Sequence, residues 1–346
     1  MTHAEMNRSM AEAIVRRSLY GIQTDPKRTI RNLVDLGRET ASGPLQQKFL
    51  GIAQQMLRQK DSPYYALVQD TVRRVDAERL MAFGMNLGWN SLTQGARTIR
   101  AEEARRGHNI PWALTLRMAR WPGSLTGGDY LRLVLEGMEL GIYSYFLLPR
   151  DQPSVTRALE LAAASRDCAF CLLLPREADA RLALGSRLVS NNLLVGLDTA
   201  APAWQEQANW LRAKRMPYLL YRHYAAAGDV EEILTGVWAR QIMPWAGVAA
   251  LLVAAPDAGD QAGAAVYRYA VESRLRQRYP TLMLDFYRDC LYADRCISGD
   301  GCFVGLLSDG TVTEYRGGCE TPTDASFRRT PLGALLRRFV KTRQAG

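Results

Sequence analysis

The side chains in this sequence with the clearest capacity for chemistry are its six cysteines. Four of them lie in the last sixth of the chain, at Cys290, Cys296, Cys302 and Cys319. Four thiolates can hold zinc or an iron–sulfur cluster, although this spacing matches neither a zinc ribbon nor a ferredoxin motif. The alternative is four unligated thiols, and the sequence leaves both interpretations open.

The other two cysteines, Cys168 and Cys171, have the CxxC spacing of metal-binding and dithiol sites. They lie at the start of, and inside, an apolar run that ends at Leu174. Because side chains alternate between the two faces of a strand, residues three apart point in opposite directions. We therefore predict that Cys168 and Cys171 are buried structural thiols.

A second set of polar residues falls where predicted strands end. Three of them are arginines, Arg150, Arg176 and Arg222. If the strands are parallel, their carboxyl ends meet at one rim, where guanidinium groups could bind a small anion. In a chain so rich in arginine, the alternative is a solvated basic rim.

Asp151, Asp198 and His223 fall at the same predicted strand ends and complete the candidate ligand-binding set. Carboxylates and imidazoles can move protons during catalysis. No residue nearby in the sequence identifies a partner for His223, so a structural histidine is the alternative. The sequence contains no Walker loop, GxGxxG motif or HExxH motif.

The elements that must position these residues predict an α/β fold. Residues 1–107 carry apolar residues at helical spacing and predict an all-helical region. Residues 108–287 alternate short apolar runs with amphipathic segments, which predicts parallel strands in an open sheet or in a full or partial barrel. Residues 288–346 are a tail containing glycine and cysteine, with a predicted β-hairpin and a C-terminal helix. The predicted strands are residues 112–116, 142–148, 169–174, 193–197, 218–221, 248–253, 281–286, 304–307 and 311–315.

Composition limits the class of protein. The 346 residues carry a formal net charge of +9, and only five of the 44 basic residues are lysines. Basic and aromatic residues are not interleaved, so we do not expect nucleic-acid binding. The first residues lack the apolar stretch of a signal peptide, and the longest uncharged apolar stretch, residues 241–255, is too short to span a bilayer. We expect a cytoplasmic protein with reduced thiols and no transmembrane segment.

Several segments together, in their order and spacing, resemble a bacterial group of radical S-adenosylmethionine proteins with a SPASM-like tail. The segments that carry this resemblance are residues 83–91, 109–112, 139–143, 285–286, 296–299 and 309–312. The resemblance covers nearly the whole chain. It implies a partial parallel (β/α) barrel over residues 108–287, a helical extension before it and a SPASM-like tail over residues 288–346.

The sequence departs from this family where the catalytic cluster would bind. Active members have a CxxxCxxC loop after the first barrel strand, whose thiolates hold three irons of a [4Fe–4S] cluster. Residues 117–128 follow the first predicted strand here, and they contain no cysteine. The resemblance therefore gives no means of holding the catalytic cluster.

Two turns that contact S-adenosylmethionine in the family also differ. Residues 149–152 replace a GGEP-type turn, and only Asp151 keeps an acid there. Residues 174–176 replace a TNG-type turn, whereas Asp198 keeps the acid at the end of the fourth strand. In the tail only Cys296 falls on a family cysteine, and Tyr315 stands where another is expected.

These departures predict a radical S-adenosylmethionine pseudoenzyme. We expect no catalytic residue and no cofactor, apart from the open question of zinc or iron–sulfur on the tail cysteines. The expected role is that of an accessory protein that binds a protein partner, such as an active paralogue, or a small anionic ligand. The alternative is an enzyme with changed chemistry at the barrel rim or with a metal centre on the tail cysteines.

Overall fold

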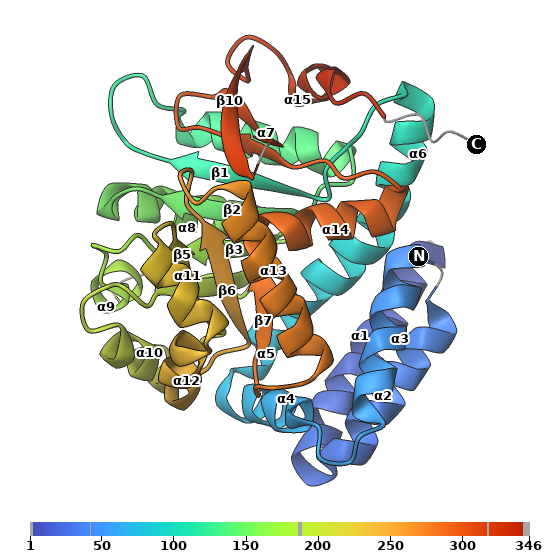
Figure 1. The fold of residues 1–346 in the computed structure, drawn as a ribbon. Helices are drawn as coiled ribbons and strands as arrows, with labels where there is room; N and C mark the ends of the chain where they lie inside the picture. Colours follow the sequence, from blue (N-terminus) through green and yellow to red (C-terminus); the bar gives the residue numbers. More distant parts are fainter. Residues whose placement is uncertain (1–2, 42, 186–188, 317, 342–346) are drawn as a thin grey trace.

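The computed structural model describes residues 3–41, 43–185, 189–316 and 318–341. As predicted, the first part of the chain is helical and lies to one side of a large sheet (Figure 1). Its helices are α1 (His3–Thr24), α2 (Pro26–Thr40), α3 (Pro44–Leu57), α4 (Pro63–Arg74), α5 (Ala77–Met85), the π-helix η1 (Asn86–Gly95) and α6 (Ala96–Arg106). Side-chain caps start several of them: Asp25, for example, accepts a hydrogen bond from the backbone of Arg28 at the start of α2.

The sheet has ten strands in the order β10-β9-β8-β1-β2-β3-β4-β5-β6-β7. Strands β1 to β7 are parallel, β8 pairs in parallel with β1, and β9 and β10 extend the edge in antiparallel pairing. The sheet curls into a half-barrel (Figure 1). The strands are β1 (Ala113–Met118), β2 (Ser144–Pro149), β3 (Ala169–Leu173), β4 (Leu193–Asp198), β5 (Tyr218–Tyr224), β6 (Ala249–Ala254), β7 (Leu282–Asp285), β8 (Val304–Leu306), β9 (Thr311–Arg316) and β10 (Cys319–Ser326).

Helices connect the parallel strands, as expected when a strand crosses to a parallel neighbour. They are α7 (Gly127–Glu139), α8 (Gln152–Ala164), α9 (Ala180–Leu184), α10 (Trp204–Ala213), α11 (Ala227–Leu234), α12 (Val237–Ile242), η2 (Met243–Trp245), α13 (Asp260–Leu275) and α14 (Phe286–Ser298). The short α15 (Leu332–Leu335) and η3 (Leu336–Arg338) follow β10. No helix in the described ranges is long and apolar enough to cross a membrane.

The structure confirms the predicted parallel strands and the hairpin, and it corrects the description of the tail. The predicted tail begins with a helix that was not predicted, because α14 continues through its first residues to Ser298. The signals for this helix are Asp285, which caps its first turn, and Gly299, which ends it with a φ of 93°. The strand β10 was not predicted at all. The pairing of β8 with β1 makes the tail strands part of the main sheet.

Two segments used for the family resemblance attach the N-terminal helices to the sheet. Asn86 donates hydrogen bonds to the carbonyls of Arg166 and Cys168, at 2.6 and 2.9 Å, and Asn90 donates to that of Asp167 at 2.8 Å. These carbonyls precede β3. The buried amides therefore hold the helical region against the amino-terminal side of the sheet.

A close approach of two glycines reinforces this attachment. Gly141 has a φ of 93°, and a Cβ built on it would lie 2.6 Å from the carbonyl oxygen of Gly95. Any larger residue at Gly141 would be strained and would push η1 away from the turn before β2. Residues 83–91 and 139–143 thus have a packing role that is independent of any activity.

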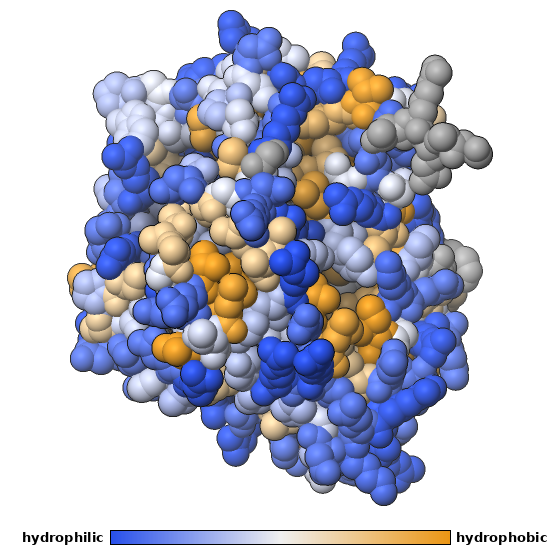
Figure 2. Space-filling model, viewed as in Figure 1, coloured by the Kyte–Doolittle hydropathy of each residue, from blue (hydrophilic) through white to orange (hydrophobic). Residues whose placement is uncertain are grey.

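The molecular surface is mainly hydrophilic on the face shown in Figure 2. Apolar residues gather there in separate small groups, one of them between α13 and the N-terminal helices. Exposed large apolar side chains also occur on the N-terminal helices, among them Met10, Tyr20 and Phe49.

We predict that Asn86→Ala lowers the free energy of unfolding by about 1–3 kcal/mol, because it removes a buried hydrogen bond to the carbonyl of Cys168 and a partly buried one to that of Arg166. Urea unfolding followed by circular dichroism measures this. The matched control is Gln59→Ala at an exposed position, which should change the free energy by less than about 0.5 kcal/mol. Equal effects of the two substitutions would contradict the attachment role of Asn86.

Candidate functional site

The strand register determines which side chains face the hollow of the half-barrel. Residues paired across neighbouring parallel strands share a face, and residues two apart on a strand do so too. Arg117 of β1 pairs with Leu148 of β2, and Phe146 lies two residues before Leu148 on the same face of β2. The ring of Phe146 packs against that of Phe286 of α14, with ring centroids 4.9 Å apart. The register of β2 with β3, of β3 with β4 and of β4 with β5 continues this face to Asp198 at the end of β4. Asp198 pairs with Tyr221 of β5, and His223, two residues further on, shares the same face. We call this concave face at the carboxyl ends of the strands the barrel mouth.

A polar network bridges the barrel mouth from β1 to β10. The Nη2 atom of Arg117 lies 2.5 Å from Oε2 of Glu320. The hydroxyl of Tyr287 donates to the same carboxylate at 3.2 Å, and that of Thr313 donates at 2.5 Å. The Glu320 side chain is 4% exposed, so these donors replace the water that a buried carboxylate needs.

Gly305 makes this bridge sterically possible. It lies on β8 between β1 and β9, where a Cβ would come within 2.4 Å of the Thr313 hydroxyl and 2.6 Å of a Glu320 oxygen. The Glu320 carboxylate occupies the space that any larger side chain would take. Burial opposes the charge on Arg117, but attraction to Glu320 outweighs it and raises the pKa of Arg117.

His223 lies in the barrel mouth near two charged groups. The His223 side chain is in contact with solvent. Because His223 lies inside the curl of the sheet, protein atoms nevertheless surround its ring on most sides. This surrounding protein lowers the pKa of His223, Asp198 opposes that effect, and Arg117 adds to it by repulsion. The imidazole is therefore mainly neutral at pH 7, beside a buried carboxylate.

Aromatic rings of α14 and the tail form a buried cluster beside Phe146. Tyr287 stacks on Tyr315 with ring centroids 4.8 Å apart, and it meets Phe303 edge-on at 5.0 Å. Phe286 meets both Tyr287 and Phe146 edge-on at 4.9 Å. The barrel mouth thus places the polar groups Arg117, Asp198 and His223 on the same face of the sheet as the half-buried Phe146.

The three predicted rim arginines do not form one anion pocket. Arg222 alternates with His223 and therefore points to the convex face, where it pairs with Asp229 and Glu232 of α11 at 2.8 and 2.6 Å. Arg150 stacks on Trp121 with its guanidinium 4.9 Å from the ring centroid. Arg176 donates to the carbonyl of Ala200 at 2.9 Å. Each guanidinium has a separate local contact.

The two predicted aspartates have different roles. Asp151 caps α8 by accepting a hydrogen bond from the backbone of Ser154 at 2.9 Å, so its position has a structural explanation. Asp198 accepts from the backbone of Ala200 at 2.8 Å and faces the barrel mouth beside His223. Of the predicted ligand-binding residues, the structure therefore brings together only Asp198 and His223.

The four tail cysteines lie in different environments. Cys290 and Cys296 are on α14, Cys302 precedes β8, and Cys319 begins β10. Cys290 and Cys302 are buried, which raises the pKa of each thiol well above its usual value. Among the described residues, no three His, Cys, Asp or Glu side chains form a group that could hold a metal ion.

Cys168 and Cys171 are both buried, as predicted. Burial raises the pKa of each thiol to about 12, so neither thiol is ionised at neutral pH. Cys171 faces the hollow, where it is in register with Phe146 of β2. The two residues behave as small apolar side chains of the core.

The residues after β1 do not fit a catalytic [4Fe–4S] cluster. Such a cluster needs several thiolates at one place, and residues 119–126, which join β1 to α7, contain no cysteine. The nearest inward side chain on β1 is the cationic Arg117, already paired with Glu320.

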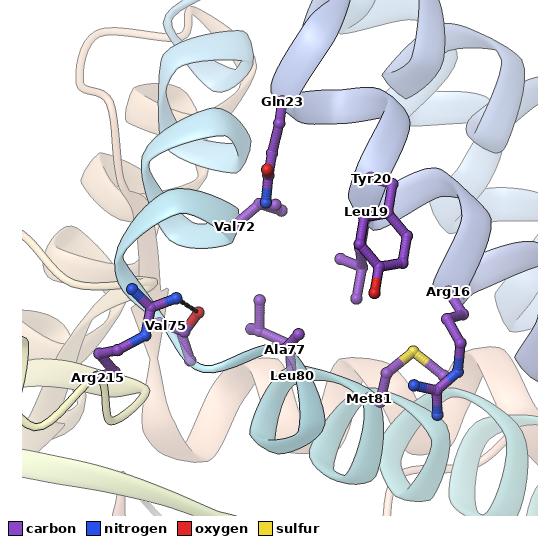
Figure 3. A pocket seen from close by; sticks show the side chains of 10 residues that line it. All are labelled: Arg16, Leu19, Tyr20, Gln23, Val72, Val75, Ala77, Leu80, Met81 and Arg215. Carbon is purple, nitrogen blue, oxygen red and sulfur yellow. Dashed lines mark hydrogen bonds between the residues drawn. The ribbon is translucent and has the colours of Figure 1, made fainter.

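A cavity of about 50 Å³ lies where the N-terminal helices meet the rest of the fold (Figure 3). Leu19 and Tyr20 of α1 face Leu80 and Met81 of α5 across it. At its edge Arg215 donates to the carbonyl of Val75 at 3.2 Å. A space of this size holds a water or two and no metabolite, so we regard it as a packing gap.

Comparison with protein-family models and with curated protein sequences finds no match for this chain.

Sequence reasoning missed the residues at the centre of the site. Arg117 was read only as part of a loop without cysteine, and Glu320, Thr313 and Tyr287 were not singled out. The sequence signal for Arg117 was a charged residue near the end of an otherwise apolar strand. Nothing in the sequence indicated Glu320, because β10 was not predicted and the contact spans 203 positions.

We predict that Arg117→Met lowers the free energy of unfolding by about 2–3 kcal/mol, because it leaves the Glu320 carboxylate buried without its cation. This is below the cost for a fully buried pair because the Arg117 side chain is 38% exposed. Thermal and urea unfolding measure the change. The double variant Arg117→Met/Glu320→Gln should recover part of the loss, and a double variant less stable than Arg117→Met would contradict the pairing.

The environment of His223 gives a second prediction, measured by NMR titration of its ring. Asp198→Asn should lower the pKa of His223 further, because the carboxylate stabilises the imidazolium. Arg117→Met should raise it, because the repelling cation is lost. Shifts in the same direction for both variants would contradict the arrangement of the barrel mouth, and His223→Asn assigns the resonance.

Proposed function

We propose that this protein is a degenerate radical S-adenosylmethionine protein that lacks the catalytic cluster and binds a small ligand at the barrel mouth. The observation that carries the proposal is the ion pair of Arg117 and Glu320 at the end of β1. In the family, the cluster loop follows this strand. A fixed guanidinium facing the hollow, with no thiolate in the following loop, supports a binding role in place of reductive chemistry.

The fold is consistent with the family resemblance at a coarse level. It has the helical region, the curled parallel sheet and the β-hairpin that the resemblance implies. The same architecture hosts many unrelated functions, so the proposal depends on the site and not on the fold.

The barrel mouth suits a small carboxylate with an apolar body. The guanidinium of Arg117 has five N–H donors and its side chain is 38% exposed, so it can bind an anion in addition to Glu320. The neutral imidazole of His223 supplies a second hydrogen-bonding group. The half-buried rings of Phe146 and Tyr315 would contact the apolar part of the ligand.

We further propose that the protein acts beside a protein partner, such as an active radical S-adenosylmethionine paralogue. A ligand-binding protein without its own catalytic cluster could hold a substrate and deliver it to such a partner. The exposed Met10, Tyr20 and Phe49 on the N-terminal helices offer apolar contacts for such a partner.

A second candidate function rests on His223 and Asp198. A neutral imidazole beside a buried carboxylate is the arrangement of a general base, so an enzyme with changed chemistry at the barrel mouth is the alternative. Turnover of a bound carboxylate that is abolished by His223→Asn, while binding persists, would favour this enzyme over the binding protein.

The binding proposal predicts that benzoate, as a probe, perturbs the NMR resonances of His223 and leaves those of the buried His108 unchanged. Arg117→Met should abolish the perturbation because it removes the anion-binding guanidinium. Absence of any perturbation, or an equal one at both histidines, would contradict ligand binding at the mouth.

The proposal also predicts that protein purified and reconstituted with iron and sulfide under anaerobic conditions retains no [4Fe–4S] cluster. Iron and sulfide analysis and the visible absorption spectrum measure this. The variant Cys296→Ser/Cys302→Ser is the matched control and should show the same metal content as the unmodified chain. A stoichiometric cluster in the unmodified chain that is lost in this variant would instead indicate a metal centre on the tail cysteines.

A further inference from the structure

A cavity of about 420 Å³ lies away from the barrel mouth, between the start of α3, α6 and the end of α14. Its lining includes Pro44, Arg100, Glu103, Arg295, Cys296 and Lys341. The volume is within the range of sites for small organic ligands. Cationic side chains outnumber the single carboxylate in this lining.

The carboxylate in the cavity wall is already neutralised. Glu103 has a fully buried side chain, and its Oε2 lies 2.8 Å from the ammonium of Lys341. Its Oε1 accepts a hydrogen bond from the backbone of Ile110 at 2.8 Å. Glu103 therefore offsets Lys341, and the charges of Arg100 and Arg295 are left over.

Arg100 is an unusual arginine in this protein. Within the described part of the chain, neither the Arg100 nor the Arg295 side chain forms a salt bridge or donates a hydrogen bond, although most other arginine side chains do. Burial and repulsion from Arg97 lower the pKa of Arg100, with Glu103 opposing them only in part. The guanidinium of Arg100 is not among the buried groups without a partner, so it is open to solvent in the cavity and can accept an anionic ligand there.

Further positive potential surrounds Arg100. Its Nη1 lies beside Gly43, the N-cap of α3, so it faces the positive end of that helix dipole. Arg295 is in the last turn of α14, a position that the helix dipole favours without any ligand, so Arg100 is the stronger indication of a bound anion. Lys48 adds a cation close to Cys296 and Tyr292, and both raise the pKa of Lys48.

We propose that this cavity binds a phosphomonoester, with the phosphoryl group held between Arg100 and Arg295 and the organic part against Pro44 and Ile297. Guanidinium groups match the geometry of phosphoryl oxygens and form charge-assisted hydrogen bonds with them. A cavity of 420 Å³ is larger than an inorganic phosphate needs, which favours a phosphorylated organic molecule. The site is independent of the barrel mouth and of its proposed function.

Cys296 supplies a direct reporter, because its partly exposed thiol lies in the cavity wall. Cys319 is exposed to a similar degree on β10 and serves as the internal control. The experiment follows alkylation of both residues by iodoacetamide, using mass spectrometry, in the presence of phenyl phosphate, inorganic phosphate or phenol. Phenyl phosphate should slow the alkylation of Cys296 and leave that of Cys319 unchanged, and phenol should protect neither.

Substitutions locate the effect. Arg295→Gln changes an exposed residue and should fold normally, and it should weaken protection by phenyl phosphate about tenfold or more, as the loss of a charge-assisted hydrogen bond implies. Arg100→Gln should do the same, with Arg100→Lys restoring part of the affinity. Arg73→Gln, on α4, is the matched control and should bind normally.

Three results would overturn the proposal: no protection of Cys296 by phenyl phosphate, equal protection of Cys296 and Cys319, or full protection in Arg295→Gln. If inorganic phosphate protects Cys296 as strongly as phenyl phosphate does, the proposal that the cavity also binds the organic part of the ligand is contradicted. Protection by phenol alone would show that the cavity recognises an apolar ring instead of a phosphoryl group.

Discussion

The ion pair between Arg117 and Glu320 is the interaction on which the arrangement of the barrel mouth depends. It joins the first strand of the half-barrel to the last strand of the sheet across Gly305, and it gathers Tyr287 and Thr313 around one buried carboxylate. A buried carboxylate without a cation would be unfavourable, so Glu320 requires the guanidinium of Arg117. The tail is thereby fixed at the end of β1, and the cation there also lowers the pKa of His223.

Much of the fold could be predicted from the sequence because its signals are local. Short apolar runs predicted the strands from β1 to β7, the hairpin pattern predicted β8 and β9, and apolar residues at helical spacing predicted the N-terminal helices. The helix α14 was not predicted, although it carries local signals: Asp285 caps its first turn and Gly299 ends it. The polar strand β10 was missed because its residues carry no strand-like alternation and depend on pairing with β9.

The candidate site was predictable only in part, because proximity in three dimensions is set by register and curl. Asp198 and His223 were recognised as residues at strand ends and do share the barrel mouth. Arg222 was placed with them, but it is one residue out of phase on the same strand and faces α11 instead. The partner of Arg117 lies on β10, which is separated from β1 by the two strands β9 and β8, and no local sequence pattern encodes this contact.

The central claim is that the end of β1 holds a fixed cation where radical chemistry would need a cluster. The most direct test is the reductive cleavage of S-adenosylmethionine by protein reconstituted with iron and sulfide without oxygen and then treated with a strong reductant. The account predicts no cleavage above the rate of reductant alone. Cleavage that requires the protein, and that exceeds this background over several turnovers, would contradict it.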